Sequence, residues 1–372
     1  MRINVVNVGD GACTVLRHQS ETMVMDCGSW HSSDGKDPAM LLRATLGAVA
    51  SMPSTVVVTH FDLDHWLGLK AFADASPSGS EHVRLIHPRL PSLVRPVQAS
   101  LLAYQTLHFT APERSSLDLF QAWESKSAVL SRTSACAGNI FTAVGTRWKV
   151  LWPPRELEAR VSNAFARVAK EAEDLAKEYE PLRRALDWAN NSPFFMDDDE
   201  EQANDLLDEF NPVVDEDVAL PGDYDLFDSY AVDGFADAPD GLRERLQKNR
   251  RDVQRINNEL SLVVEEVHGR FLNLGDIQKW GLNELIRRRA MQECYDTILA
   301  PHHGTQAPGV RTASDFPWSR LVIAQNGAGH HPRLRKELSA HTHKLISTAD
   351  SGSVTIRGRY HCPTAYCSCR HP

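Results

Sequence analysis

The chain has 372 residues, 42% of them hydrophobic and 24% charged, a composition typical of a globular protein with one or two cores. It contains no run of about 18 apolar residues and no N-terminal signal-peptide pattern, so we expect a cytoplasmic protein with no membrane partner. Seven cysteines spread over this length indicate reduced thiols rather than a disulfide framework.

Negative charge is concentrated in one segment. Of the 49 Asp and Glu residues, 17 lie between Asp197 and Asp240, where no Lys or Arg occurs. The rest of the chain therefore holds 32 acids against 40 bases and is net positive. A positive body tolerates a polyanionic substrate such as nucleic acid.

Short strands and turns dominate the first 154 residues. Apolar, β-branched runs predict strands, whereas the spacing of apolar residues predicts helices at 38–50 and near 115–129. The predicted strands cover residues 3–8, 12–17, 22–26, 54–59, 83–86 and 148–152.

The pattern changes between 155 and 256. Apolar residues three and four apart predict a long amphipathic helix over 155–190, kinked at Pro181, and a second helix follows at 240–257. We therefore expect an α/β domain formed by residues 1–154 and 257–360, with a helical, acidic insertion at 155–256. Its C-terminal strands are predicted at residues 261–267, 271–274, 297–300, 321–324, 345–348 and 354–356.

Four side chains of the metal-ligand type follow the strand predicted at 54–59: His60, Asp62, Asp64 and His65. A loop at the end of a strand can turn all four toward one point. Imidazole and carboxylate are the usual ligands of hydrolytic zinc or manganese sites. A polar loop rich in turn-forming residues is the alternative for this segment.

Two later clusters also follow predicted strands. Asp276 lies in Leu-Gly-Asp-Ile, and His302 and His303 lie in Pro-His-His-Gly. Each signal is weak alone, because a strand-ending Asp is often a helix cap and paired histidines are often exposed. All three clusters end strands, so we expect them to converge on one edge, with Asp276 as a candidate bridging carboxylate.

These motifs, in this order, resemble those of the metallo-β-lactamase superfamily, and within it the hydrolase domain of the competence DNA-uptake protein ComEC. The family motif His-x-His-x-Asp-His corresponds to His-x-Asp-x-Asp-His here. The other matching segments are VGDGA at 8–12, DCG at 26–28, VLWP at 150–153, NELSLV at 258–263, LGDI at 274–277, PHHGT at 301–305 and NGAGHHP at 326–332.

The resemblance implies a four-layer αββα sandwich that holds two divalent metal ions, Zn²⁺ or Mn²⁺, at one edge. By the resemblance, His60 binds the first metal, Asp64 and His65 bind the second, and Asp276 bridges them. Asp64 would also orient the attacking water, which makes it a catalytic candidate.

The resemblance further implies that one of the paired histidines completes the second site. His303 is favoured as the ligand, and His302 as a catalytic residue that contacts the substrate. Asp26 and Asn258 are expected to support the ligands from behind, because a strand-ending Asp commonly holds a neighbouring loop through backbone hydrogen bonds.

The chain departs from the family at Asp62, which replaces the second His of the motif and is taken as a ligand. We find no clear counterpart of the further first-site His. An oxygen-rich first site favours Mn²⁺ or Fe over Zn²⁺. A decayed site kept as a scaffold is the alternative. Trp66, directly after the motif, is treated as a residue lining the substrate mouth.

Three functions follow from these observations. The first is a metal-dependent hydrolase that cleaves phosphodiesters of a nucleic acid or nucleotide, and the second is an ester, amide or lactam hydrolase of the same fold. The third is a catalytically degenerate scaffold that acts as a binding or regulatory subunit, with the insertion 155–256 as its interface with a protein partner.

Two segments stand outside this site. Cys362, Cys367, Cys369 and His371, in the tail 361–372, could hold a separate structural Zn²⁺, with free thiols as the alternative. The acidic segment 197–240 is either a solvated loop or, because aromatic residues are interleaved with its acids, a docking segment for a basic partner.

Overall fold

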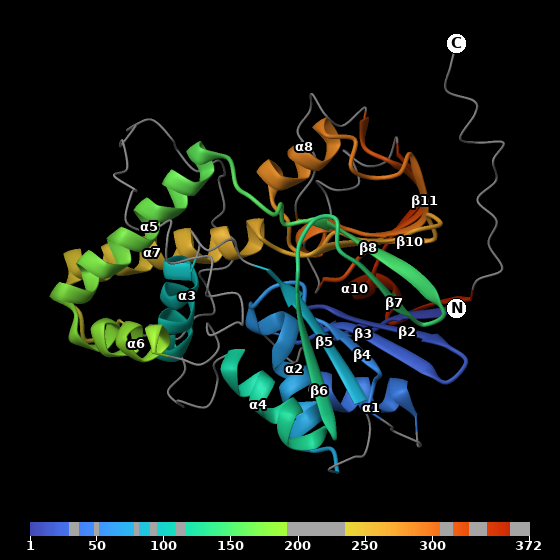
Figure 1. Ribbon diagram of the computed structural model, residues 1–372, viewed down its shortest axis with the longest axis horizontal. Coiled ribbons are helices and arrows are strands. Elements are labelled where there is room, and N and C mark those ends of the chain that lie inside the picture. The colour runs from blue at the N-terminus through green and yellow to red at the C-terminus, as the bar shows by residue number, and fades with distance from the viewer. Residues whose placement is uncertain are drawn as a thin grey trace. The chain divides into compact units, whose positions relative to one another are not determined.

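The computed structural model describes residues 1–29, 37–47, 52–77, 82–89, 95–108, 116–191, 235–305, 315–326 and 341–357 (Figure 1). The chain divides into two compact units. Unit 1 is Met1–Arg89, Leu119–Pro154 and Asn258–Pro372, and unit 2 is Leu90–Asp118 and Arg155–Asn257. Within the described ranges, every helix is too short or too polar to cross a bilayer.

Unit 1 contains two seven-stranded sheets. In the first sheet, β3 to β6 run parallel, and the remaining pairs are antiparallel. Its order is β14 (Val354–Arg357), β1 (Arg2–Val5), β2 (Cys13–His18), β3 (Glu21–Cys27), β4 (Thr55–Val57), β5 (His82–Pro88) and β6 (Val129–Ala135).

The second sheet is mixed in the same way. Strands β10 to β13 run parallel, whereas β7, β8 and β9 pair antiparallel with their neighbours. Its order is β13 (Thr342–Ser347), β12 (Trp318–Ala324), β11 (Cys294–Leu299), β10 (Phe271–Asn273), β9 (Val263–Glu266), β8 (Thr146–Trp152) and β7 (Ile140–Ala143).

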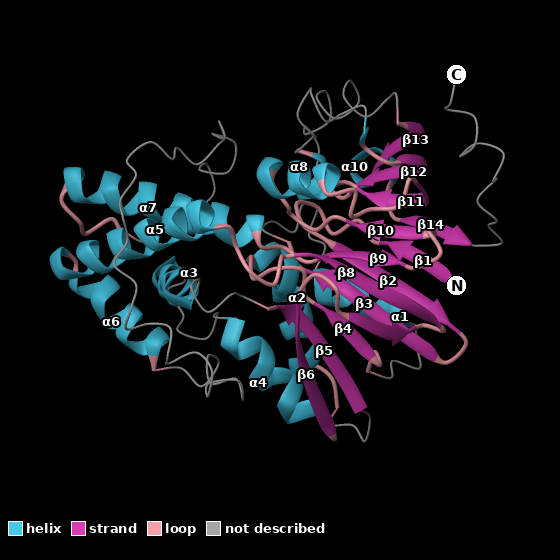
Figure 2. Ribbon diagram, turned by 45° about the horizontal axis from the view of Figure 1, so that its top comes forward, coloured by secondary structure: helices cyan, strands magenta, loops and turns pink. Residues whose placement is uncertain are grey.

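The two sheets pack face to face over one apolar core. Met25 and Val57 of the first sheet share a buried cluster with Trp148 and Phe271 of the second. Helices α1 (Pro38–Leu46), α2 (Leu63–Asp74) and α4 (Ser116–Lys126) lie with the first sheet, and α8 (Lys279–Arg287) packs on the outer face of the second (Figure 2). The expected αββα order of layers is confirmed.

Unit 2 is helical. It contains α3 (Arg95–His108), α5 (Ala159–Glu178), α6 (Glu180–Asn190) and most of α7 (Asp240–Glu259). Inside it, the buried Asn249 amide donates to the carbonyl of Val168 (2.9 Å) and accepts from the Tyr104 hydroxyl (2.6 Å). Burial and the nearby Glu171 carboxylate raise the pKa of Tyr104. This network ties α3, α5 and α7 together.

The elements differ from the predicted ones in two places. The helix predicted over 155–190 is two helices, because Pro181 lies in the first turn of α6, where its missing N–H costs no hydrogen bond. Residues 90–118, predicted as part of the α/β domain, group with the helical unit instead, because Ala99 and Leu102 of α3 pack against Ala189 of α6. Most of the acidic segment, 192–234, and the tail 361–372 lie outside the described residues.

Candidate metal centre

The predicted ligands lie at the carboxyl ends of strands in both sheets. His60 follows β4, Asp276 follows β10, and His302 and His303 follow β11. All are buried, with at most 7% of their surface exposed. The two sheets therefore bring the three motifs to one edge of unit 1, where open α/β sheets commonly bind ligands.

The motif after β4 forms a loop and the first turn of α2. Helix α2 begins at Leu63, so Asp64 and His65 lie in its first turn, where the helix dipole favours a carboxylate. The end of β3 approaches this turn closely. A Cβ atom on Gly28 would lie 2.4 Å from the carbonyl oxygen of Leu63, so only glycine permits the approach.

The Pro-His-His-Gly segment forms a 3₁₀ turn (Pro301–Gly304) with an unusual backbone. His302 and His303 both have left-handed conformations, with φ of 48° and 55°. Such a conformation costs a non-glycine residue about 1 to 3 kcal/mol and is found mostly at functional sites. The N–H of His302 donates to the carbonyl of Gly275 (2.9 Å), which joins this turn to the Asp276 loop.

Two groups of ligand atoms result. The first group is His60, His65 and Asp276; the second group is Asp64, His65 and His303. Within each group the ligand atoms lie within 4.8 Å of one another. In the second group, Nε2 of His303 is 3.1 Å from Asp64 Oδ2 and 3.0 Å from Nε2 of His65.

The Asp276 carboxylate lies against four imidazoles. Its oxygens are 3.3 Å from Nε2 of His65, 3.4 Å from that of His303, 3.6 Å from that of His302 and 3.8 Å from that of His60. Asp276 belongs to the first group and also contacts His303 of the second, as a bridging carboxylate must.

The two remaining predicted residues lie at the margin of the groups. Asp62 precedes α2 and belongs to neither group, although its Oδ2 is 3.5 Å from Nε2 of His60. His302 contacts Asp276, but it also stays outside both groups. Of the paired histidines, His303 is thus the one whose Nε2 faces Asp64 and His65.

Asp26 supports the site from behind, at the end of β3. Its carboxylate accepts from the N–H (2.7 Å) and hydroxyl (2.8 Å) of Thr59, and it lies 3.1 Å from Nδ1 of His65. Similarly, Nδ1 of His303 donates to the carbonyl of Gln325 (2.9 Å). With Nδ1 of each ring so engaged, Nε2 faces the ligand groups.

Asn258 lies one turn before β9. It is buried, and its carbonyl oxygen accepts from the N–H of Ser261 (3.0 Å). The Asn258–Ser261 turn therefore shapes the chain beside the site. Thr59 and Gln325, by contrast, contact ligands directly: the Thr59 hydroxyl is 3.2 Å from Nδ1 of both His60 and His65, and the Gln325 carbonyl accepts from His303. The only sequence signal of either residue is its position near the end of a strand.

A divalent cation fits this set of donors. Nε2 of His60 and Oδ1 of Asp64 are buried and make no hydrogen bond among the described residues. Buried polar atoms without a partner are costly, and they are commonly satisfied by a bound water or ion. Imidazole nitrogens and carboxylate oxygens in these proportions suit Zn²⁺ and Mn²⁺.

Carboxylates and imidazoles of the site stabilise one another's charged forms. Burial disfavours charge on every group, but the imidazoles of His303 and His65 lower the pKa of Asp276 well below its ordinary value. Conversely, the Asp276 carboxylate outweighs burial and raises the pKa of His65, and with Asp64 it raises that of His303 to about 10. A cation that binds here therefore displaces protons.

His302 behaves differently from its neighbour. Burial lowers its pKa, and the Asp276 carboxylate only partly offsets this effect. Its imidazole is therefore neutral near pH 7 and can exchange hydrogen bonds or a proton with a reacting group.

Trp66 does not line an opening. Its side chain is fully buried, and its indole N–H donates to the carbonyl of Phe61 (3.1 Å). The expectation that it forms a substrate mouth is wrong, because a fully buried side chain cannot line an opening. The predicted tail ligands, Cys362 to His371, lie outside the described residues.

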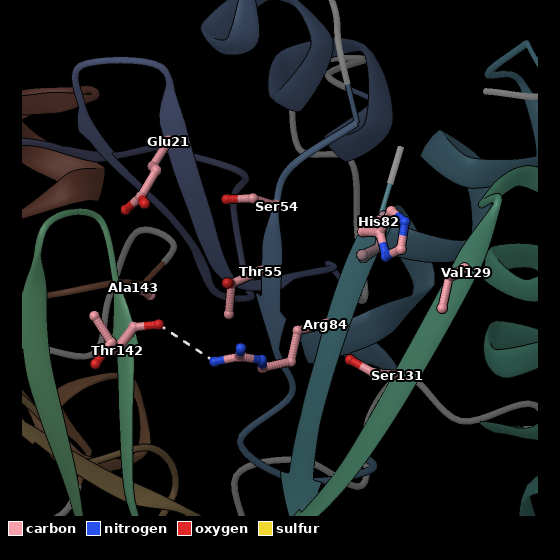
Figure 3. A pocket seen from close by; sticks show the side chains of 10 residues that line it. Glu21, Ser54, Thr55, His82, Arg84, Val129, Ser131, Thr142 and Ala143 are labelled. Atoms are coloured by element: carbon pink, nitrogen blue, oxygen red, sulfur yellow. Dashed lines mark hydrogen bonds between the residues drawn. The ribbon is translucent and has the colours of Figure 1, made fainter. Parts of the chain in front are cut away.

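A second hollow, of about 290 Å³, lies at the amino ends of β3 to β6, and we call it the amino-end pocket (Figure 3). Arg84 reaches across it and donates to the carbonyl of Thr142 (3.3 Å), and Glu21 accepts from the N–H of Gly145 (2.8 Å). Its other lining residues are Ser54, Thr55, His82, Val83, Val129, Ser131 and Ala143.

Comparison with known proteins identifies the fold. Residues 6–126, about a third of the chain, match the family model of the metallo-beta-lactamase superfamily. Together with the two packed sheets and their outer helices, this match shows that unit 1 has the metallo-beta-lactamase fold. No curated protein sequence matches the chain.

The chain is also similar, at low sequence identity, to two solved structures. The metallo-beta-lactamase fold protein YhfI from Bacillus subtilis has 10% identity and a TM-score of 0.43, over 96% of this chain and 99% of that one. The short form of human tRNase Z (ELAC1) has 15% identity and a TM-score of 0.25, over 42% of this chain and 61% of that one.

Proposed function

We propose that the protein is a metal-dependent hydrolase of the metallo-β-lactamase superfamily, with two divalent cations at the carboxyl-end edge. The observation that carries this proposal is the meeting of buried His and Asp side chains from three distant segments: His60, Asp62, Asp64 and His65, then Asp276, then His303. Two of their polar atoms, Nε2 of His60 and Oδ1 of Asp64, make no hydrogen bond among the described residues. Maintaining such a cluster opposes folding, so a function is the expected reason for it.

His60 would bind the first cation, Asp64, His65 and His303 would bind the second, and Asp276 would bridge the two. We include Asp62 as a further oxygen ligand of the first cation, because its carboxylate approaches His60. Cations at such a site activate water for attack and offset the negative charge that develops on the substrate. Because oxygen ligands are numerous, we favour Mn²⁺, with Zn²⁺ as the alternative.

Two side chains would act on the reacting groups. Asp64 binds with one oxygen next to His303, so Oδ1 remains to accept a hydrogen bond from the attacking water and to orient it. His302, neutral and 7% exposed, can donate a hydrogen bond to the substrate or carry a proton to the leaving oxygen.

We favour a phosphodiester substrate, in a nucleic acid or nucleotide. Two observations support this choice: the ordered resemblance to the ComEC hydrolase domain, and the excess of bases over acids outside the acidic segment. An ester, amide or lactam substrate is the second candidate, because the metal groups alone suit any of these bonds.

The test is a substrate panel. Full-length protein loaded with Mn²⁺ or Zn²⁺ should cleave single-stranded DNA, RNA or a cyclic nucleotide faster than ester and lactam substrates, and Asp64→Ala should abolish the activity. Metal analysis comes first: a degenerate scaffold would hold less than one equivalent. In that case the helical insertion, proposed as a protein interface, becomes the functional part.

A further inference from the structure

Ser261 is a buried residue for which neither the fold nor the proposed mechanism yet accounts. Its surface is fully buried, and its hydroxyl makes no hydrogen bond among the described residues. A hydroxyl removed from water without a partner opposes folding. Either a bound group or the packing of the surrounding residues must explain why this hydroxyl is buried.

The backbone places Ser261 beside the first group of ligands. The N–H of the next residue, Leu262, donates to the carbonyl of Thr59 (2.7 Å), and Thr59 directly precedes His60. On the other side, a Cβ atom on Gly275 would lie 3.1 Å from Cβ of Ser261. Gly275 directly precedes Asp276.

Ser261 therefore lies between the two loops that supply His60 and Asp276. The three segments are so close that Cβ of Thr59 is also only 3.2 Å from the same point at Gly275. The left-handed conformation of Gly275 (φ 53°) and the missing side chain both permit this approach.

Two neighbouring segments thus each bury an atom with a free lone pair: Nε2 of His60 and the hydroxyl oxygen of Ser261. From this we infer that the hydroxyl oxygen of Ser261 is a ligand of the cation that His60 and Asp276 hold. The inference rests on the proposed metal centre and adds a neutral oxygen to it, which makes the first site harder in character.

Position distinguishes Ser261 from other hydroxyls. Ser162 in α5 is also buried and has no hydrogen-bond partner in the described part of the chain, but it belongs to the helical unit and not to the α/β unit that contains the centre. Ser162→Ala is therefore a matched control for Ser261→Ala. Both variants remove one buried hydroxyl without a hydrogen-bond partner and leave the rest of the side chain.

The experiment measures metal binding, without a substrate. Full-length protein is stripped with a chelator and titrated calorimetrically with Mn²⁺ and with Zn²⁺, and its thermal midpoint is recorded without metal. We expect Ser261→Ala to unfold at the same or a higher temperature and to bind one of its two equivalents about 10- to 100-fold more weakly. Ser162→Ala should bind both like the parent.

Unchanged dissociation constants in a folded Ser261→Ala variant would overturn the inference and leave the proposed function intact. If the parent protein itself binds neither ion, the proposed centre fails instead, so the two failures are distinguishable. Ser261→Cys adds a second readout, because a thiolate ligand should raise the affinity for Zn²⁺ relative to Mn²⁺. An unaltered ratio of the two affinities contradicts direct ligation.

Discussion

The two ends of the parallel strands in unit 1 carry polar groups in opposite ways. At the carboxyl ends, His and Asp side chains are buried against one another, and some of their atoms make no hydrogen bond. At the amino ends, Arg84 and Glu21 line an open pocket, where each bonds to a backbone group. The same strands build both edges.

The difference supports the carboxyl-end edge as the proposed reaction site. Exposed side chains bonded to nearby backbone cost the fold little, whereas a buried cluster of opposite charges is costly to form. The left-handed His302 and His303 add backbone strain at the same place. Of the two edges, the carboxyl-end edge is therefore the one where buried charge opposes folding, as expected where function requires it.

The largest expected effect is that of removing the metal. Treatment with a chelator should reduce hydrolysis to background, and re-addition of Mn²⁺ or Zn²⁺ should restore it. A cation that binds only the folded protein stabilises it by about 2.7 kcal/mol at 100 times its dissociation constant, so the thermal midpoint should fall on chelation. An unaltered midpoint together with unaltered turnover contradicts the metal centre.

Asp276→Asn should have the next largest effect, because this carboxylate contacts four imidazoles. We expect both metal equivalents to weaken by more than the about 100-fold that loss of an outer-shell partner typically costs. Metal content measured by mass spectrometry checks this. Asp296→Asn is the control, since Asp296 is a buried carboxylate of β11 outside both ligand groups, and it should keep its metal.

The paired histidines should separate binding from turnover. His303→Gln should lose the second metal, because Nε2 of His303 faces Asp64 and His65. His302→Gln should keep both metals and lower kcat by about 10²-fold or more, the contribution typical of a proton-transfer group. Calorimetric stoichiometry and steady-state rates measured on both variants test the pair. Reversed results would exchange the two roles.

Asp26→Asn should weaken metal binding by about 10- to 100-fold while the fold persists. The amide still accepts a hydrogen bond from the Thr59 N–H, but it no longer supplies a charge beside Nδ1 of His65. Titration of the stripped variant with Mn²⁺ measures the loss. Affinity equal to that of the parent would show that Asp26 serves only the loop.

Arg84→Gln should have the smallest effect. The side chain is exposed and, among the described residues, its one hydrogen bond is to the carbonyl of Thr142 in the amino-end pocket, so stability should change by no more than about 0.5 kcal/mol. Metal content and turnover should equal those of the parent. A loss of turnover in the Arg84→Gln variant would contradict the view that only the carboxyl-end edge takes part in the reaction.

The sequence predicts the layers and the site region because both leave short-range signals. Apolar, β-branched runs mark the strands, and each ligand motif follows one of them, as at His60 after β4 and Asp276 after β10. Convergence then follows from the rule that parallel strands end at the same edge. The resemblance supplied the pairing of motifs across the sheets, which local patterns do not contain.

Other features are set by tertiary contacts and were missed or misplaced. Helix α2 begins inside the ligand motif, where the polar residues obscure the helical spacing of the apolar ones. Trp66 was therefore expected to line the opening of the substrate site, but it is buried. Helix α3 packs in the helical unit through apolar residues such as Ala99 and Leu102. Nothing in the local sequence indicates which helix such residues contact. Thr59 and Gln325 act through backbone neighbours that only the fold brings close.

Each ligand group draws two side chains from the N-terminal half of the chain and one from the C-terminal half. Metal binding and the packing of the N-terminal half against the C-terminal half are therefore thermodynamically linked. A truncation in the shared apolar core, such as Phe271→Ala, would lower the free energy of unfolding by about 3 to 5 kcal/mol. It would also weaken metal binding, although Phe271 is not a ligand. Metal release would then report on how firmly the two halves hold together.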